Sequence, residues 1–238
     1  STSAAQVCQS LKLSQDDKCL CMWEQFHIGG FVDLLLAPIM SGGTISITDG
    51  FNCDGFYKAL EINNPTWFQA VPASLNEITN QAKNYENLIK NHSLRFIRSV
   101  AAPLTEKTFN ALVQAFSVPI IQTYGMTEAS PLITSTSLKN FQNKFNTVGR
   151  SCGCEVAVFE SGKIVTKPFF EGQLVIRGDN VFSGYLNDDI SNKELFVDKG
   201  WFLTGDLGYF DDSKNLYITG RTKELINRGG EKINPVEV

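Results

Sequence analysis

The 238-residue sequence has little that would favour a nucleic acid or a membrane as partner. It carries 21 Lys and Arg against 25 Asp and Glu, and this formal net charge of −4 gives no general attraction to phosphate backbones or anionic lipids. The most apolar stretch, residues 31–47, is interrupted by Asp33, Pro38 and Gly42, so it is too short to span a bilayer. No signal peptide is visible. We therefore expect no nucleic-acid partner, no membrane span and a cytoplasmic location.

Ligands for a metal such as zinc are also few. The sequence has two histidines and no CxxC pair, although Cys19 and Cys21, like Cys152 and Cys154, lie two residues apart, a spacing that places both on one face of a strand. The six cysteines stand at positions 8, 19, 21, 53, 152 and 154. We expect free, buried thiols in a reducing compartment rather than a zinc site.

What the chain does have is the composition of a globular protein. Its 42% hydrophobic and 19% charged residues are typical of folded domains rather than disordered ones. A chain of this length buries about 70–75% of the surface that its unfolded form exposes. We expect one large domain or two unequal ones.

Helix and strand patterns alternate through residues 1–137. Apolar residues recur at helical spacing in residues 4–13, 30–40, 56–63, 74–90 and 105–116. Short β-branched or apolar runs predict strands at 44–48, 66–71, 94–100 and 118–125. Strands separated by helices favour right-handed crossovers and a mainly parallel sheet, and ligands gather at the carboxyl ends of such strands. The segments that directly follow two of these strands are 101–104 and 124–128.

The pattern changes near Gly149. From there to Gly220 the sequence alternates short strands with turns such as Glu160-Ser161-Gly162, which predicts a small β-barrel or a sandwich of mixed pairing. The fold class is therefore α/β, with a mainly parallel sheet and flanking helices followed by a small β-barrel subdomain. We expect three parts: residues 1–145, 146–220 and 221–238.

The first candidate binding motif is YGMTE, residues 124–128. Tyr124 could stack on a purine, Thr127 could donate a hydrogen bond to a phosphate oxygen, and Glu128 could bind Mg²⁺. The alternative is a strand that ends in a turn, with Thr127 capping the next segment.

Two further motifs lie near the end of the chain. Asp206, in the segment TGD, could accept hydrogen bonds from a ribose diol, or Gly-Asp could be an ordinary turn signal. Arg221 could make a forked contact with ribose or phosphate oxygens, and glycines in the run 228–232 would allow close backbone approach. A solvated charged helix followed by a turn explains the same run equally well.

Taken together, these segments resemble the acyl-adenylate-forming (AMP-binding) superfamily, which includes acyl- and aryl-CoA ligases, adenylation domains and firefly luciferase. The similarity extends over essentially the whole chain, through FHIGG, PTWFQAVPASL, LRFIRSVAAPL, YGMTE, EGQLVIRGDNVFSGYLN, GWFLTGD and GRTKELINRGGEKINPVEV, in that order. Gln173 stands where the family usually has Glu. The closest resemblance is to small-acid CoA ligases, including oxalyl-CoA synthetase-like proteins, although Ser130-Pro131 stands here where those proteins have a His-bearing stretch.

The resemblance implies a role for each matched residue. Thr127 and Glu128 would be catalytic, with Glu128 also holding Mg²⁺. The nucleotide would be bound by Ala101, Ala102, Pro103, Tyr124, Gly125, Met126, Thr127, Asp206 and Arg221, with Tyr124 on adenine and the last two on the ribose. The acyl pocket would be bordered by His27, Val71, Val100, Gly125 and Met126. Lys223 would be the hinge, and the thiol loop would contain Arg228, Gly229, Gly230 and Lys232.

The function implied is an ATP-dependent, AMP-forming ligase that activates a small carboxylic acid as acyl-AMP and transfers it to coenzyme A. ATP, Mg²⁺ and coenzyme A are the expected cofactors. Two alternatives stay open: an adenylation domain that loads the pantetheine arm of a carrier protein, and a non-catalytic nucleotide- or acyl-binding module. The family's N-terminal phosphate loop and C-terminal lid have no counterpart in the sequence, so we expect this chain alone to be weakly active or inactive.

Overall fold

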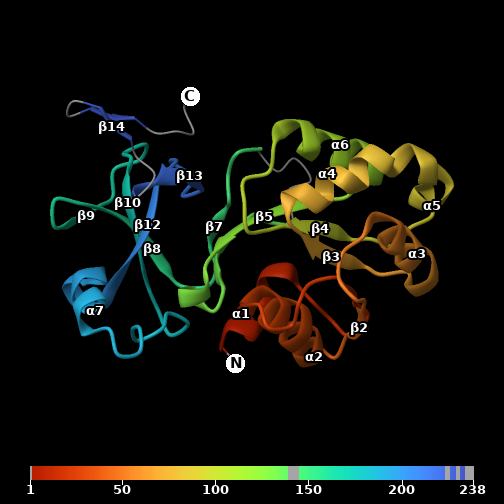
Figure 1. The fold of residues 1–238 in the computed structure, drawn as a ribbon, viewed down its shortest axis with the longest axis horizontal. Coiled ribbons are helices and arrows are strands. Elements are labelled where there is room, and N and C mark those ends of the chain that lie inside the picture. The colour runs from red at the N-terminus through yellow and green to blue at the C-terminus, as the bar shows by residue number, and fades with distance from the viewer. Residues whose placement is uncertain (1, 139–144, 223–225, 229–230, 234–238) are drawn as a thin grey trace.

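The computed structural model describes residues 2–138, 145–222, 226–228 and 231–233. Two sheets lie side by side along the longest axis, the first flanked by helices and the second formed by the C-terminal part of the chain (Figure 1).

The first sheet contains seven strands in the order β2-β1-β3-β4-β5-β6-β7. Its strands are β1 (Lys18–Cys21), β2 (Thr44–Ile47), β3 (Trp67–Ala70), β4 (Phe96–Ser99), β5 (Ile120–Gly125), β6 (Leu132–Ser135) and β7 (Arg150–Ser151). Strands β1 to β5 pair in parallel, whereas β6 and β7 join antiparallel. The predicted α/β class with a mainly parallel sheet is confirmed.

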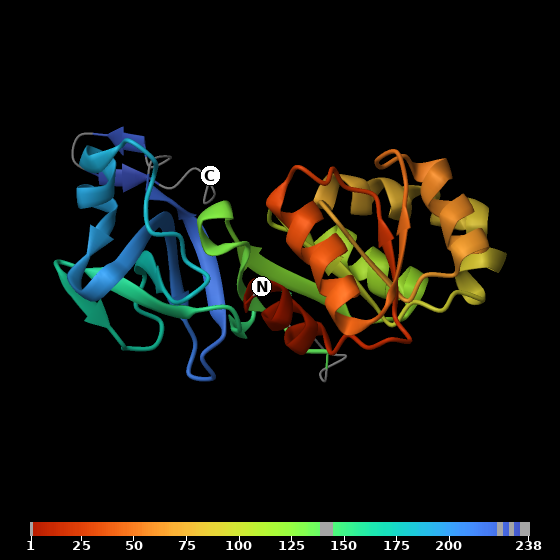
Figure 2. The same cartoon turned by 90° about the horizontal axis from the view of Figure 1, so that it is seen from below.

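Helices cover both faces of this sheet (Figures 1 and 2). One face carries α1 (Thr2–Leu11), the π-helix η1 (Gly29–Leu36) and α2 (Ala37–Ser41), and the other carries α3 (Cys53–Asn63), α4 (Pro72–Gln81), η2 (Ala82–Tyr85), α5 (Glu86–Lys90) and α6 (Glu106–Phe116). Successive side chains along each strand point to opposite faces of the sheet, so the core has two parts. Trp67 and Phe96 pack with α1 and η1, whereas Phe68 and Ile97 pack with α3 to α6.

Capping side chains and a glycine mark where several helices begin and end. The Asn52 side chain accepts a hydrogen bond from Gly55 N at 2.6 Å and begins α3, and Thr105 accepts one from Thr108 N at 3.2 Å and begins α6. Gly42, with φ of +75°, ends α2 in the left-handed conformation that glycine adopts readily.

Two local predictions for this half were incomplete. Strand β1 was not predicted, because a four-residue buried run is too short to show an alternating pattern. The helix predicted at 30–40 is a π-helix followed by a short α-helix, and the helix predicted at 74–90 is divided into α4, η2 and α5.

The second sheet has six strands in the order β11-β12-β10-β8-β9, with β13 also paired to β12. They are β8 (Glu155–Glu160), β9 (Lys163–Val165), β10 (Gly172–Arg177), β11 (Phe196–Val197), β12 (Trp201–Phe210) and β13 (Leu216–Arg221), with α7 (Asp189–Leu195) and η4 (Asp198–Gly200) before β12. Every pair in this sheet is antiparallel, where mixed pairing was one expectation. The division of the chain at residues 145 and 220 stays a prediction.

Backbone and hydroxyl contacts join the two sheets. Val148 N donates to Leu216 O at 3.0 Å, Leu216 N donates to Gly149 O at 2.7 Å, and Thr147 Oγ1 donates to Leu216 O at 2.8 Å. Thr134 Oγ1, on β6, donates to Val148 O at 2.8 Å. The segment between β6 and β7 therefore fixes β13 against the first sheet.

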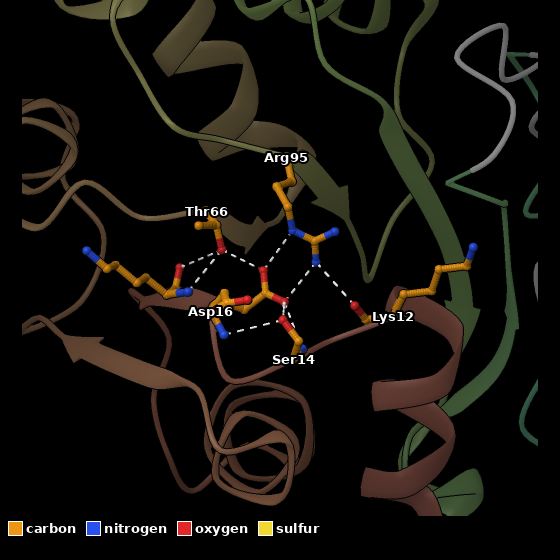
Figure 3. Close-up of polar contacts among 7 residues, drawn as sticks. Lys12, Ser14, Asp16, Thr66 and Arg95 are labelled. Atoms are coloured by element: carbon orange, nitrogen blue, oxygen red, sulfur yellow. Dashed lines mark hydrogen bonds and ion pairs between the residues drawn. The ribbon is translucent and has the colours of Figure 1, made fainter.

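A polar cluster lies at the amino-terminal ends of β1, β3 and β4 (Figure 3). The buried Asp17 carboxylate accepts hydrogen bonds from Ser14 N at 2.9 Å, Thr66 Oγ1 at 2.7 Å, and Arg95 Nε and Nη2 at 2.8 and 2.9 Å. Burial by itself would raise the pKa of Asp17, but the hydrogen bonds from Arg95, Thr66 and Ser14 outweigh it and hold this pKa below its ordinary value.

Within the described residues, no helix has both the length and the apolar character needed to cross a bilayer. All six cysteines are free thiols, of which Cys19, Cys21 and Cys53 are buried. Cys19 and Cys21 do face the same core, as their spacing predicted.

Candidate functional site

The carboxyl ends of three adjacent parallel strands bring most of the expected residues to one edge of the first sheet. Val71 follows β3, the segment 100–103 follows β4, and Tyr124 and Gly125 end β5. Ala101, Ala102 and Pro103 are exposed, and Ala101 has φ of +71°, which places this backbone in a sharp turn at the edge. The arrangement agrees with the rule that ligands bind beyond the carboxyl ends of parallel strands.

Asp206 reaches this edge from the second sheet because β12 contains a bulge. Between the paired positions Gln173–Leu207 and Val175–Leu203, β12 has more residues than β10. The excess surrounds Gly205, whose φ of +79° allows the strand to kink and continue. Reading Gly-Asp as a turn was therefore wrong, because β12 runs through Asp206 as a paired strand.

Asp206 lies between Tyr124 and Arg221. The Tyr124 hydroxyl donates to Asp206 Oδ2 at 2.5 Å, and Arg221 Nε lies 2.8 Å from Oδ1. Asp206 is 11% exposed at its side chain and Arg221 57%, so the carboxylate is sheltered while the guanidinium faces solvent. Burial, followed by the negative charge of Asp206, raises the pKa of Tyr124 well above its ordinary value, so the phenol remains protonated and donates.

Two threonines that sequence analysis did not single out support this arrangement. Thr204 Oγ1 accepts from Asp206 N at 3.1 Å and donates to Leu174 O at 3.0 Å. Thr222 Oγ1 donates to Gly205 O at 3.0 Å. Their hydroxyls hold both sides of the bulge, a role that no local sequence pattern reveals.

The chain turns sharply after β5, and Gly125 makes this turn possible. A Cβ at Gly125 would overlap the carbonyl oxygen of Pro131, to which Met126 N donates at 3.0 Å. The short helix η3 (Thr127–Ala129) follows, with Thr127 exposed and Glu128 half-buried.

Glu128 is the residue in this turn that suits a divalent cation. Its Oε1 accepts a hydrogen bond from the Tyr185 hydroxyl at 2.7 Å, and Oε2 has no hydrogen-bond donor within the described part of the chain. In that same part of the chain, no three His, Cys, Asp or Glu side chains gather as a metal cage. One carboxylate with a free oxygen fits Mg²⁺, which is commonly held by one or two carboxylates together with substrate phosphates.

The residues expected to border an acyl pocket are less closely gathered. His27 is exposed and stacks on Trp23 with ring centroids 5.0 Å apart, and its Nδ1 accepts from Gly29 N at 3.1 Å. Val100 is buried and Met126 half-buried. Two open cavities, of about 570 and 410 Å³, lie elsewhere, around α3. The pocket role of His27, Val71, Val100, Gly125 and Met126 stays a prediction.

A buried ion pair lies beside this region, and no sequence pattern predicts that its two members meet. Arg98 Nη1, on β4, is 2.7 Å from Asp33 Oδ2 on η1 and donates to Gln69 Oε1 on β3 at 2.6 Å. The side chains of Arg98 and Asp33 are only 2% and 4% exposed. Gln69 Nε2 in turn donates to Gly29 O at 3.4 Å, so the network ties η1 to the sheet.

The remaining expected residues fall at the end of the chain. Lys223, Gly229 and Gly230 lie outside the described residues. Arg228 belongs to β14 (Ile226–Arg228) and Lys232 to β15 (Glu231–Ile233), two strands that pair antiparallel.

Comparison with known proteins identifies similar chains. The family model described as "AMP-binding enzyme" matches residues 1–186. The oxalate–CoA ligase of Saccharomyces cerevisiae is 37% identical over 237 residues, covering 99% of this chain and 43% of that protein. The oxalate–CoA ligase of Arabidopsis thaliana is 36% identical over 230 residues, covering 95% of this chain and 44% of that protein. The chain thus spans less than half the length of these relatives.

Solved structures give the same result for the fold. O-succinylbenzoate coenzyme A synthetase from Bacillus subtilis, in complex with AMP, superposes with a TM-score of 0.87 at 27% identity, over 99% of this chain and 47% of that one.

Proposed function

Because this chain belongs to the AMP-binding enzyme family, we propose that it contributes the nucleotide and acid sites of an ATP-dependent, AMP-forming acid–CoA ligase. The relatives of similar sequence are named CoA ligases, which supports coenzyme A as the acceptor.

The observation that carries the proposal is the position of Asp206 between Tyr124 and Arg221. A sheltered carboxylate beside a solvent-facing guanidinium offers acceptors and donors to the two hydroxyls of a ribose. Tyr124 precedes the sharp turn at Gly125, where one side of its ring can stack on adenine. The exposed backbone of 101–103, at the neighbouring strand end, would border the base.

The adjoining turn would hold the phosphates. Thr127 is exposed and would donate to the α-phosphate, with the backbone of Gly125 and Met126 beside it. Glu128 would hold Mg²⁺ through its free carboxylate oxygen, and the ion would neutralise charge on the phosphates when bound.

The chemistry has two steps. A carboxylate oxygen of the acid attacks the α-phosphorus of ATP, the bond from that phosphorus to the bridging oxygen breaks, and acyl-AMP and pyrophosphate form. The thiol of coenzyme A then loses its proton to solvent, its sulfur attacks the acyl carbon, and AMP leaves with the electrons of the broken carbon–oxygen bond.

Other roles in this proposal rest on the family pattern. His27, Val71, Val100, Gly125 and Met126 would border the acid, Lys223 would act as the hinge, and the acceptor thiol would approach by the loop that contains Arg228, Gly229, Gly230 and Lys232. The names of the relatives support oxalate as the first acid to examine.

Nucleotide binding tests the ribose assignment directly. We expect the 238-residue chain to bind AMP in calorimetric titrations, and Asp206→Asn to weaken binding about 10- to 100-fold, because charged hydrogen bonds contribute about 1.5–3 kcal/mol. Asp212→Asn, an exposed acid in the turn after β12, is the matched control and should leave affinity unchanged. Equal affinity for AMP in the wild-type chain and Asp206→Asn would refute the assignment.

Pyrophosphate exchange tests catalysis. The complete product of the gene that encodes this sequence should exchange pyrophosphate into ATP with oxalate, O-succinylbenzoate or acetate, and should form the matching CoA thioester. AMP binding without exchange for any acid in a broad panel would favour a non-catalytic binding module instead.

A further inference from the structure

The loop between β10 and α7, residues 178–188, contacts Glu128 at several points. The Tyr185 hydroxyl donates to Glu128 Oε1 at 2.7 Å, and Phe182 N donates to Glu128 O at 2.9 Å. Asn180 Nδ2 donates to Ala129 O at 2.7 Å, one residue further along η3. Backbone and side chain of Glu128 are therefore both contacted by residues more than fifty positions away.

The loop is itself fixed by helix α7. Asn192 accepts from Tyr185 N at 2.7 Å through Oδ1 and donates to Tyr185 O at 2.8 Å through Nδ2. The Asn192 amide lies against Gly184, where φ is +135° and a Cβ would approach this amide closely. Phe182 meets the Tyr185 ring edge-on, with centroids 4.9 Å apart. The position of the Tyr185 hydroxyl is thus set from two sides.

We propose that Tyr185 is a positioning residue for a metal-binding Glu128, with Asn192 holding Tyr185 in place. A hydrogen bond to Oε1 restricts rotation of the carboxylate and leaves Oε2 directed to a cation. Carboxylate ligands are commonly oriented by such outer hydrogen bonds, and their loss weakens metal binding. This inference rests on the proposed function, because it takes Glu128 as the metal ligand.

The test compares metal binding with metal-free nucleotide binding in the same chain. Mn²⁺, followed by the electron paramagnetic resonance signal of the free ion in the presence of ATP, is the metal probe, and calorimetric titration of AMP without metal is the second measurement. We expect Tyr185→Phe and Asn192→Ala each to weaken Mn²⁺ binding about tenfold. Loss of a hydrogen bond to a metal ligand commonly weakens metal binding about 10- to 100-fold, and the smaller value applies because Tyr185 is partly exposed. Both variants should leave AMP affinity within about twofold of wild type. Tyr217→Phe, which changes a half-buried tyrosine on β13 whose hydroxyl lies 3.4 Å from Asp211 Oδ2, is the control and should change neither.

The outcomes distinguish a failure of the positioning role of Tyr185 from a failure of the proposed function. If Glu128→Gln abolishes Mn²⁺ binding while Tyr185→Phe leaves it at the wild-type value, Tyr185 has no positioning role and the proposed function stands. If Tyr185→Phe weakens AMP and Mn²⁺ equally, its role is general folding and the inference is overturned. A wild-type chain that binds neither AMP nor Mn²⁺ with ATP would overturn the proposed function and this inference together.

Discussion

Replacing Asp17 by Asn should destabilise the fold in a way that depends on pH. The carboxylate accepts five hydrogen bonds, two from Ser14, one from Thr66 and two from Arg95 (Figure 3), and Asp17 is 4% exposed. The amide of Asn keeps the shape but loses the charge and directs an NH₂ group toward donors. Breaking a fully buried ion pair costs about 3–5 kcal/mol, but the Arg95 side chain can turn to solvent, so we expect a loss of about 2–3 kcal/mol.

The sign of the pH dependence follows from the lowered pKa of Asp17. A carboxyl with a lower pKa in the folded state stabilises the fold above the unfolded value, ordinarily 3.8, and this contribution is lost as pH falls through the folded pKa. The difference between the wild-type chain and Asp17→Asn should therefore be constant near neutrality and shrink below pH of about 4.

Urea denaturation followed by the fluorescence of the three tryptophans, of which Trp67 is buried next to Thr66, measures both effects. Asp16→Asn, which changes an exposed neighbouring acid, should be within about 0.5 kcal/mol of wild type at every pH. A difference for Asp17→Asn that is absent at pH 7, or that persists undiminished under acid conditions, would show that the cluster does not stabilise the fold as argued.

Three further changes have expected outcomes. Asp33→Asn should cost about 3–5 kcal/mol in urea denaturation, because the buried Arg98 charge loses its partner; a loss below about 1 kcal/mol would mean that Arg98 finds another. Gly125→Ala should cost about 1–3 kcal/mol and reduce AMP affinity, because its Cβ meets the Pro131 carbonyl; unchanged affinity in titration would show that the turn adapts. Tyr57→Phe should cost about 1–2 kcal/mol in the same denaturation assay, since it leaves a buried carbonyl of α4 without its 2.8 Å donor; no change would imply that water takes the place of the hydroxyl.

Sequence patterns predicted most of the parallel part of the fold, because its longer helices show their period and its strands are apolar runs between them; β1, a buried run of four residues, was missed. The strands ending at Ala70, Ser99 and Gly125 lie where hydrophobic runs placed them, and so do the segments that follow. Patterns left the local structure at Asp206 open, because Gly-Asp is a local turn signal and only the pairing of β12 with neighbouring strands keeps this residue in a sheet.

Contacts between distant residues were beyond any spacing rule. Tyr185 meets Glu128 across 57 positions, and Arg98 meets Asp33 although Asp33 in sequence merely interrupts an apolar run. Such pairs arise when the sheet and the bulge bring remote segments together, so they depend on tertiary structure rather than on local preference.

The hydrogen bonds of Thr147, Val148 and Gly149 with Leu216 have a consequence for the rate of ligand association. They hold β13 against the first sheet, so that the Tyr124 hydroxyl and Asp206 Oδ2, from different sheets, are already 2.5 Å apart. A nucleotide that meets such a preassembled pair needs no slow rearrangement of the protein before it is held. In stopped-flow mixing with AMP, the observed rate constant should therefore rise linearly with nucleotide concentration and show no plateau.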